Sequence, residues 1–226
     1  MRYMRRASVT LAAVGLAFAL GGTASGASGT GQDAAQSCGA LKLSGSLPVP
    51  PAGMSVQQTV TVGEDCEPEL GPVRYARAST AAKAPARGIT AAATTGRQIR
   101  SWNEMFDCCN IRMTGLYSKA DWSTADGRIS KATTSATQEW NREPWNAGWS
   151  LKSADQKQDC AADCAVVNQE AHASFTYKGI FDLTGDWYAN THHSYVKLTG
   201  DAAPTCTFDV ELKHTFVGWN WQRGCE

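Results

Sequence analysis

The chain has 226 residues and a formal net charge of zero, because 21 lysines and arginines balance 21 aspartates and glutamates. Charged residues make up 19% of the chain and hydrophobic residues 42%, which is normal for a globular protein and unlike a disordered one. A nucleic-acid-binding protein usually shows its basic face in such totals, so this balance argues against a nucleic-acid partner. The unusual counts are eight cysteines and eight tryptophans.

The first 27 residues have the three parts of a secretory signal peptide. Three arginines form a positive start, an apolar stretch covers residues 9–20, and small residues allow cleavage after Ala24 or Ala27. The apolar stretch would span about 18 Å as a helix, which is short of the roughly 30 Å core of a bilayer. An uncleaved anchor is the less favoured alternative. We therefore expect a secreted protein with no membrane-inserting segment once the signal peptide is removed.

Composition divides the remaining sequence into three regions. Residues 28–73 form a small module in which we expect Cys38 and Cys66 to pair, because so short a segment buries little core by itself. Residues 74–97 contain nine alanines, five basic residues and no acidic residue, which predicts a flexible linker. The alternative for this linker is a cleavage site that releases a pro-segment. Residues 98–226 hold all eight tryptophans and are mildly acidic, and any activity is expected there.

Alternation of polar and apolar residues predicts β-strands through much of the chain. The pattern recurs in four segments, namely residues 56–62, 111–118, 167–178 and 187–198. The Asp126-Gly127 dipeptide is typical of a two-residue hairpin turn. Residues 131–141 and 154–170 are less regular and leave a helical turn or two open. We predict an all-β fold: an antiparallel, disulfide-linked sandwich or barrel with a small N-terminal disulfide module.

In an exported protein an even number of cysteines indicates disulfides rather than a zinc site. The eight cysteines all follow the signal peptide, at Cys38, Cys66, Cys108, Cys109, Cys160, Cys164, Cys206 and Cys225. We expect Cys206 to face Cys225 across a terminal hairpin in which Val210 faces Trp221. For the two remaining close pairs we favour crossed bridges, because a bridge between adjacent cysteines is strained. A bridge within the second close pair, across one helical turn, is the alternative.

The sequence carries no motif of a known catalytic, metal or cofactor site. We therefore predict no metal and no cofactor, and we assign no catalytic residue. His192 and His193 are adjacent in an expected strand and would point to opposite faces. One of them can meet His172 or His214 on a neighbouring strand, but structural or solvent-facing histidines are the simpler interpretation.

The tryptophans are the most informative feature of the last region. Trp219 and Trp221 lie in a predicted strand among aliphatic residues and are expected in the core. A second group lies in a loop-like stretch that contains Gly, Asn and Pro, where exposed flat rings would stack on sugars. Its candidate ligand-binding residues are Trp140, Asn141, Trp145, Asn146 and Trp149.

These features predict a secreted, non-catalytic binding module whose ligand is a polysaccharide or another cell-envelope component. One alternative is a secreted hydrolase with a cleavable N-terminal pro-segment, which needs two carboxylates facing across a cleft. Asp209 and Glu211 share a strand face, but they alternate with apolar residues as on any solvated strand. The other alternative is a proteinase-inhibitor-like protein, for which we recognise no reactive loop. The sequence assigns no oligomeric state.

Overall fold

Twelve strands and no helix make up the part of the chain that the computed structural model describes, residues 36–78, 96–141 and 148–226. The strands are β1 (Ser37–Leu47), β2 (Met54–Val62), β3 (Pro68–Leu70), β4 (Arg74–Arg77), β5 (Arg97–Phe106), β6 (Arg112–Ala125), β7 (Arg128–Trp140), β8 (Gly148–Gln158), β9 (Val166–Lys178), β10 (Ala189–Thr199), β11 (Thr205–Phe216) and β12 (Asn220–Cys225). The expected signal peptide lies outside the described residues.

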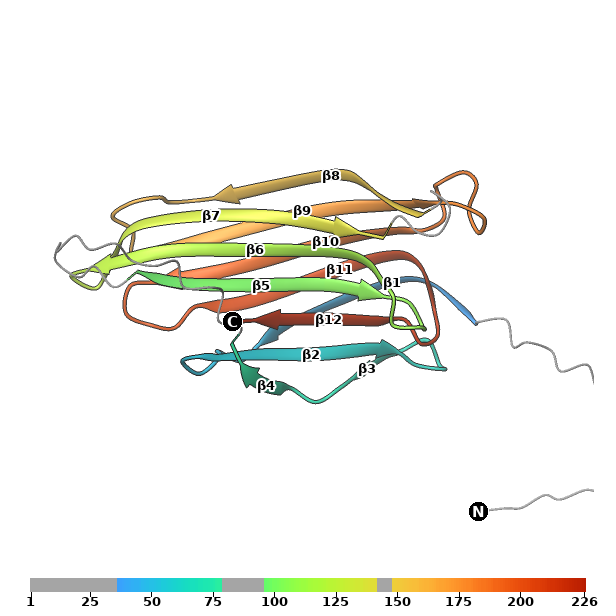
Figure 1. Cartoon of the computed structure of the whole chain (residues 1–226), viewed down its shortest axis with the longest axis horizontal. Helices are drawn as coiled ribbons and strands as arrows, with labels where there is room; N and C mark the ends of the chain where they lie inside the picture. Colours follow the sequence, from blue (N-terminus) through green and yellow to red (C-terminus); the bar gives the residue numbers. More distant parts are fainter. Residues whose placement is uncertain (1–35, 79–95, 142–147) are drawn as a thin grey trace, which may run out of the picture. The chain divides into compact units, whose positions relative to one another are not determined.

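The strands form two antiparallel sheets that pack on either side of a shared core (Figure 1). The five-stranded sheet has the order β1-β11-β10-β9-β8, and the seven-stranded sheet has the order β3-β2-β12-β5-β6-β7, with β4 paired to β2. The predicted all-β antiparallel fold is confirmed, and so is the turn between β6 and β7, where Asp126 and Gly127 both have positive φ, 52° and 73°. The helical turns left open at 131–141 and 154–170 are absent from the described residues there, which lie in β7, β8, β9 and the β8–β9 connection.

The N-terminal strands are built into both sheets. β1 pairs with β11 in the five-stranded sheet, and β2 pairs with β12 in the seven-stranded sheet. The expected linker begins with β4, which pairs with β2. The described part of residues 28–73 is therefore not a separate fold from residues 98–226, because each supplies strands that the other needs for its hydrogen bonds. Most of the linker, residues 79–95, lies outside the described residues.

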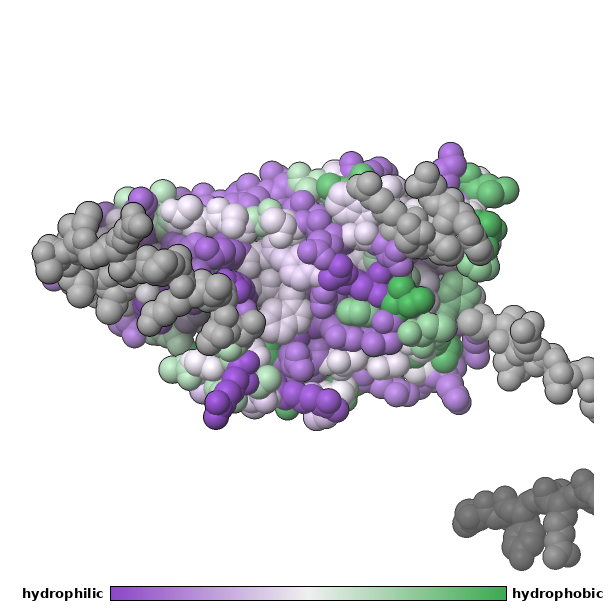
Figure 2. Space-filling view, in the orientation of Figure 1, coloured by the Kyte–Doolittle hydropathy of each residue, from purple (hydrophilic) through white to green (hydrophobic). Residues whose placement is uncertain are grey.

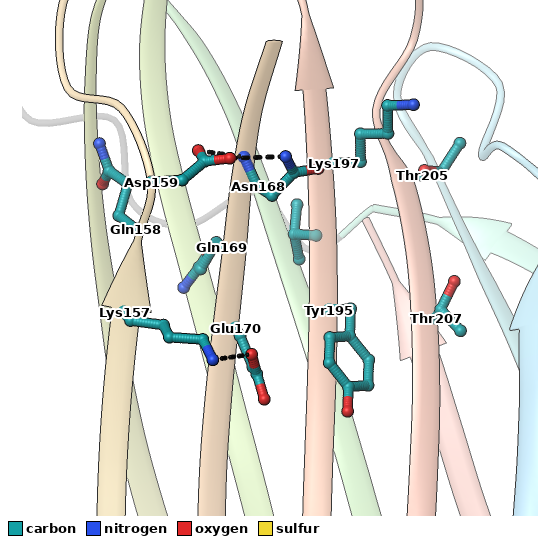
Figure 3. Close-up of a pocket in the computed structure, with 11 residues that line it drawn as sticks. Lys157, Gln158, Asp159, Asn168, Gln169, Glu170, Tyr195, Lys197, Thr205 and Thr207 are labelled. Atoms are coloured by element: carbon teal, nitrogen blue, oxygen red, sulfur yellow. Dashed lines mark hydrogen bonds and ion pairs between the residues drawn. The ribbon is translucent and has the colours of Figure 1, made fainter.

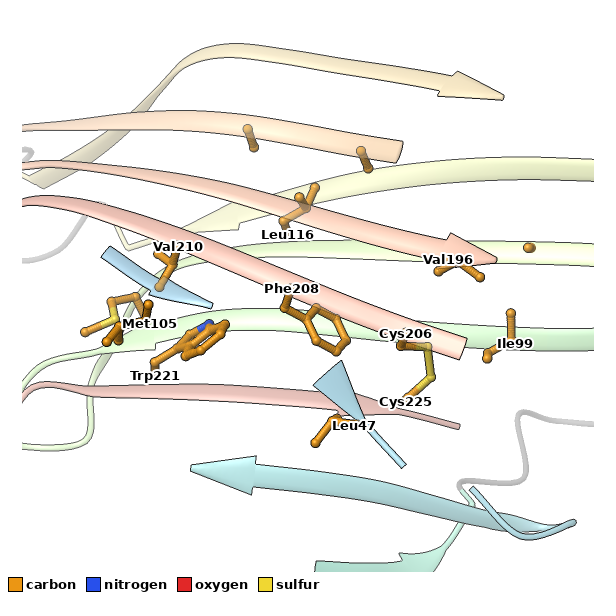
Figure 4. Packing of buried hydrophobic residues seen from close by; sticks show 14 of the residues in the cluster. Leu47, Ile99, Met105, Leu116, Val196, Cys206, Phe208, Val210, Trp221 and Cys225 are labelled. Carbon is orange, nitrogen blue, oxygen red and sulfur yellow. A yellow bond between two sulfur atoms is a disulfide. The ribbon is translucent and has the colours of Figure 1, made fainter. Parts of the chain in front are cut away.

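The core lies between the sheets and is filled by alternate residues of each strand (Figure 4). Cys206 of β11 and Cys225 of β12 form the expected disulfide and join the two sheets. The expected hairpin register is wrong, since β11 pairs with β1 and β10, whereas β12 pairs with β2 and β5. Val210 and Trp221 both point into the core, but from different sheets. The chain crosses between the sheets near Gly218, whose φ of 84° makes the sharp turn possible.

Three disulfides are present in the described residues: Cys38–Cys66, Cys160–Cys164 and Cys206–Cys225. The crossed bridges expected for the other four cysteines are wrong, because Cys160 pairs with Cys164 while Cys108 and Cys109 are free and exposed. The β5–β6 turn, with Cys108 and Cys109, and the β8–β9 connection lie at opposite ends of the strands (Figure 1). A ten-residue strand is roughly 33 Å long, whereas bridged Cα atoms lie no more than about 7 Å apart.

A buried polar cluster crosses the middle of the core and links the two sheets. Its members are Asn103 of β5, Thr114 of β6, Asn190 and His192 of β10, and Trp221 of β12. The Asn103 side-chain oxygen accepts hydrogen bonds from the Trp221 indole (2.7 Å) and from His192 Nδ1 (2.9 Å). Its amide nitrogen donates to one backbone carbonyl of β10 (2.9 Å) and one of β11 (3.1 Å). Every polar atom of this side chain is therefore paired, which buried amides require.

The other half of the polar cluster holds His192 in its neutral form. His192 Nε2 accepts from the Thr114 hydroxyl (2.8 Å), which itself accepts from the Asn190 amide (3.0 Å). An imidazole protonated on Nδ1 only fits both partners, because Nδ1 then donates to Asn103 and Nε2 accepts from Thr114. Complete burial lowers the pKa of His192 from its ordinary value of 6.5 to about 3, with smaller contributions from His193 and His172.

The polar cluster predicts a loss of stability in mild acid. Because the pKa of His192 is lower in the folded than in the unfolded protein, the unfolded chain binds an extra proton as the pH falls from 6.5 toward 3. We expect the free energy of unfolding to fall over this window by up to about 1.4 kcal/mol per pH unit for this group. Urea unfolding between about pH 7 and pH 5 measures it, and His192→Gln should have the shallower slope. Equal slopes would contradict the assignment.

The disulfide pattern makes a second prediction. Replacing Cys108 and Cys109 together by serine should change the unfolding free energy by no more than about 0.5 kcal/mol, because neither thiol holds the fold together. Replacing Cys206 and Cys225 together should cost about 3 kcal/mol, the value for a closed loop of this size. Chemical denaturation of the two double variants measures the difference. A large loss of unfolding free energy in the variant without Cys108 and Cys109 would instead support the crossed disulfide pairing.

Candidate functional site

The tryptophans first expected to bind a ligand lie mostly inside the protein. Trp149 is 7% exposed, and its ring centroid lies 5.8 Å from that of Tyr177. Trp140 packs against the core with its ring 6.1 Å from that of Phe175. Asn141 accepts the backbone N–H of Trp149 at 2.9 Å and so ties the start of β8 to the end of β7. Trp145 and Asn146 lie outside the described residues. Trp140 and Trp149 therefore fill space between the sheets rather than forming an exposed surface.

One set of hydrogen bonds in the polar cluster joins the residue types of a catalytic triad. The Thr114 hydroxyl, the His192 imidazole and the Asn103 amide are hydrogen-bonded in the order nucleophile, base and orienting group. All three residues are completely buried, at 0% exposure, so no substrate reaches the hydroxyl. These three hydrogen-bonded side chains therefore form a structural link between the sheets.

The histidine and carboxylate positions follow the strand pairing. His192 and His193 point to opposite faces, as predicted: His192 lies in the core and His193 points outward. His193 meets His172 with ring centroids 4.7 Å apart. Asp209 and Glu211 lie on the same outward face, where Glu211 pairs with Lys42 at 2.7 Å. Within residues 36–78, 96–141 and 148–226, no group of three or more His, Cys, Asp or Glu side chains is arranged to hold a metal ion.

The outward face of the five-stranded sheet carries a shallow groove of about 440 Å³ beside Tyr195 (Figure 3). Four of its polar side chains already bind one another: Lys157 pairs with Glu170 at 2.6 Å, and the Asn168 amide donates to Asp159 at 2.6 Å. Tyr195 is the one aromatic ring among the described residues that line this groove. The groove therefore offers a flat ligand little stacking surface.

The outward face of the seven-stranded sheet carries one aromatic residue on each of two adjacent strands. Trp102 of β5 lies directly opposite Tyr117 of β6 in the strand register, and both rings are partly exposed. We call these two residues the aromatic platform. They line a hollow of about 480 Å³ whose other lining residues are Arg100, Ser101, Glu104, Ser118, Lys119, Ser135, Thr137 and Glu226. Figure 2 shows this face, and its centre is coloured for intermediate and hydrophilic residues, with little that is strongly hydrophobic.

Two glycines allow the rings of the aromatic platform to lie down on the sheet. Gly224 of β12 is opposite Trp102, and a β-carbon there would overlap the indole, so the ring occupies the space of the missing side chain. Gly115 of β6 is two residues from Tyr117 on the same face, and a β-carbon there would lie 3.1 Å from the tyrosine hydroxyl. Rings that lie along the sheet turn a flat face to solvent, whereas rings that stand upright expose mainly an edge.

Charged side chains hold Tyr117 of the aromatic platform in place. Arg112 donates to the Tyr117 hydroxyl at 2.6 Å and pairs with the carboxylates of Glu104 and Glu139. The Tyr117 hydroxyl donates in turn to Glu104. Burial and the neighbouring Glu104 carboxylate raise the pKa of Tyr117, so this phenol stays protonated and keeps its hydrogen bond.

The remaining charges around the hollow are also paired. Arg100 binds Glu226 at 3.5 Å, and Lys119 binds Asp121 at 2.7 Å. The rim therefore offers many hydrogen-bonding groups without a strong field of either sign, which suits a neutral polar ligand better than an ion.

Comparison with protein-family models, with curated proteins and with solved structures finds no match to this chain. The three disulfides are consistent with an extracellular protein. No helix in the described ranges is long and apolar enough to cross a membrane.

Sequence reasoning missed the aromatic platform although part of its signal was present. Ile99, Ser101 and Asn103 alternate with outward residues, so the period of β5 alone would place Trp102 outside the core. The support of Gly224 could not be found this way, because it lies more than a hundred residues further along the chain. Only the pairing of β12 with β5 brings the glycine under the indole.

The glycine under the indole gives a stability prediction. Gly224→Ala should push the Trp102 ring off the sheet and cost about 1 to 3 kcal/mol, the usual penalty for forcing extra atoms into a packed site. Gly96→Ala is the matched control, because no atom lies within 4 Å of a β-carbon at that position. Chemical denaturation of both variants tests the geometry, and equal unfolding free energies would show that the indole does not rest on Gly224.

Proposed function

We propose that this protein is a secreted, non-catalytic binding module that holds a neutral polysaccharide of the cell envelope or its surroundings on the aromatic platform. The observation that carries the proposal is the pair of flat, partly exposed rings, Trp102 and Tyr117, on adjacent strands. The C–H face of a sugar ring is apolar and packs against such a ring, which combines a large contact area with a polar edge. Neighbouring strands lie about 4.8 Å apart, so a chain molecule that crosses β5 and β6 can reach both rings.

The rim of the hollow supplies the polar half of sugar recognition. Hydroxyl groups of a glycan both donate and accept hydrogen bonds, and the rim offers both kinds of partner in Thr137, Glu104 and Arg100. The ion pairs at this rim orient their side chains before a ligand arrives, which lowers the entropy cost of binding. Each charge at the rim already has an opposite neighbour. A neutral glycan that enters the hollow therefore loses less solvation free energy than a charged glycan would.

The same geometry supports binding rather than cleavage. Glycoside hydrolysis requires one carboxylic acid that gives up a proton and a second carboxylate that acts on the other side of the bond. Two carboxylates, Glu104 and Glu226, line the hollow. Glu104 shares the guanidinium of Arg112 with Glu139, and Glu226 binds Arg100. These ion pairs make the carboxylates supports for the rim rather than an acid and a nucleophile. Export itself is supported by the signal peptide predicted at 1–27 and by the disulfides.

The test is to titrate the secreted protein with a panel of neutral and charged polysaccharides. Calorimetry and tryptophan fluorescence measure the binding. Trp102→Ala should weaken binding of the responding polysaccharide by about tenfold or more, which corresponds to about 1.4 kcal/mol. Trp187→Ala is the matched control, since Trp187 is 58% exposed but lies in the β9–β10 connection. The proposal fails when no polysaccharide binds the unmodified protein, or when both variants lose affinity equally.

A further inference from the structure

Two neighbouring thiols meet in the turn that joins β5 to β6. Cys108 Sγ and Cys109 Sγ lie 3.6 Å apart, and both side chains are exposed. The other cysteines of the chain are paired in the three disulfides, so the fold leaves only these two thiols unused. Side chains of adjacent residues in a strand point to opposite faces, so two adjacent sulfurs in contact need a different backbone.

A tight turn provides that backbone. Cys108 and Cys109 are the central residues of a β-turn, which is closed by the Asn110 N–H donating to the Asp107 carbonyl at 3.1 Å. The Asp107 carboxylate accepts the backbone N–H groups of Cys109 (2.9 Å) and Ile111 (2.8 Å). Asn110 has a φ of 60°, the left-handed conformation that commonly follows such a turn in hairpin loops. The chain therefore reverses at the two cysteines, and this reversal lets their sulfurs meet.

Residues from the end of the chain hold this turn in place. The Asn220 amide of β12 donates to the Asp107 carbonyl at 3.3 Å. Gly218 leaves room for Cys108, since a β-carbon at that glycine would lie 3.3 Å from the β-carbon of Cys108. The two sulfurs are therefore presented by a turn that is anchored to the seven-stranded sheet.

Two thiols in contact can exchange with a disulfide in two steps, of which only the first needs a molecule from solution. The pKa of the Cys108 thiol is raised by its hydrogen bond with Cys109, and further by burial and by the nearby charges of Cys109 and Asp107. The nucleophile in such an exchange is a thiolate. Because Cys108 holds its proton, the first attack falls to Cys109 and the second to Cys108.

We propose that Cys108 and Cys109 form a reversible thiol–disulfide exchange site whose substrate is a low-molecular-weight disulfide, R–S–S–R. Cys109 releases its proton to solvent and attacks one sulfur, so a Cys109–S–S–R bond forms and an R–S⁻ thiolate leaves. Cys108 then releases its proton and attacks the Cys109 sulfur, so the Cys108–Cys109 bond forms and a second R–S⁻ leaves. The protein gives up two electrons and two protons, and the small disulfide becomes two R–SH molecules. This site does not depend on the proposed glycan site.

The position of the pair favours a small substrate and a reaction that is easily reversed. Both cysteines are exposed in a turn, so a small disulfide reaches them without any movement of the fold. A bridge between adjacent cysteines is strained, which makes it easier to reduce than an unstrained structural bridge. By contrast, the side chains of Cys164, Cys206 and Cys225 are at most 3% exposed. We therefore expect exchange to be confined to the pair in the turn.

Incubation of the full secreted chain with glutathione disulfide, followed by mass spectrometry, tests the proposal. A chain isolated with the Cys108–Cys109 bridge is first opened with reduced glutathione. The unmodified protein should lose the mass of two hydrogen atoms and retain no glutathione. Cys108→Ser should instead stop at a mixed disulfide on Cys109, because the second thiol is missing. This mixed disulfide should last at least about ten times longer than in the unmodified chain, where the second attack is intramolecular.

The control is the double variant Cys108→Ser/Cys109→Ser, which should not react. Peptide mapping of the oxidised protein should find the Cys108–Cys109 bridge, and excess reduced glutathione should open it. The proposal is overturned by an unreactive pair, by two glutathiones retained on the unmodified protein, or by disulfide-linked dimers. A bridge from either cysteine to a different cysteine, or one that reduced glutathione does not open, also overturns it.

Discussion

The hydrogen bonds of Asn103 are the constraint on which both outward faces depend. This one side chain binds an indole and an imidazole and reaches backbone carbonyls of the opposite sheet. Because strand neighbours point to opposite sides, an inward Asn103 makes Trp102 outward, and an inward His192 makes His193 outward. A one-residue slip of either strand would bury the outward residue and break the polar cluster, so the core fixes the register that the surface requires.

Features that depend on near neighbours were predictable from the sequence. The strand at 56–62 and the turn at Asp126 and Gly127 follow from local alternation and turn chemistry. The Cys38–Cys66 bridge followed from the only two cysteines of its region, whereas the Cys206–Cys225 bridge is present although the hairpin register from which we expected it is wrong. The sheet to which each strand belongs was not predictable, because the pairings of β1 with β11 and of β2 with β12 join segments more than a hundred residues apart. Local pattern contains no information about such partners.

The candidate site shows the same limit more sharply. The stretch around Trp140 and Trp149 has loop-like composition, yet β7 runs through Trp140 and β8 resumes at Gly148, so alternation places both rings inward. Trp102 offered the opposite case: an isolated tryptophan becomes a surface ring because Gly224 lies beneath it. Exposure of an aromatic side chain depends on what faces it across strands. A glycine that is distant in the sequence gives no local sign that it will lie beneath a ring.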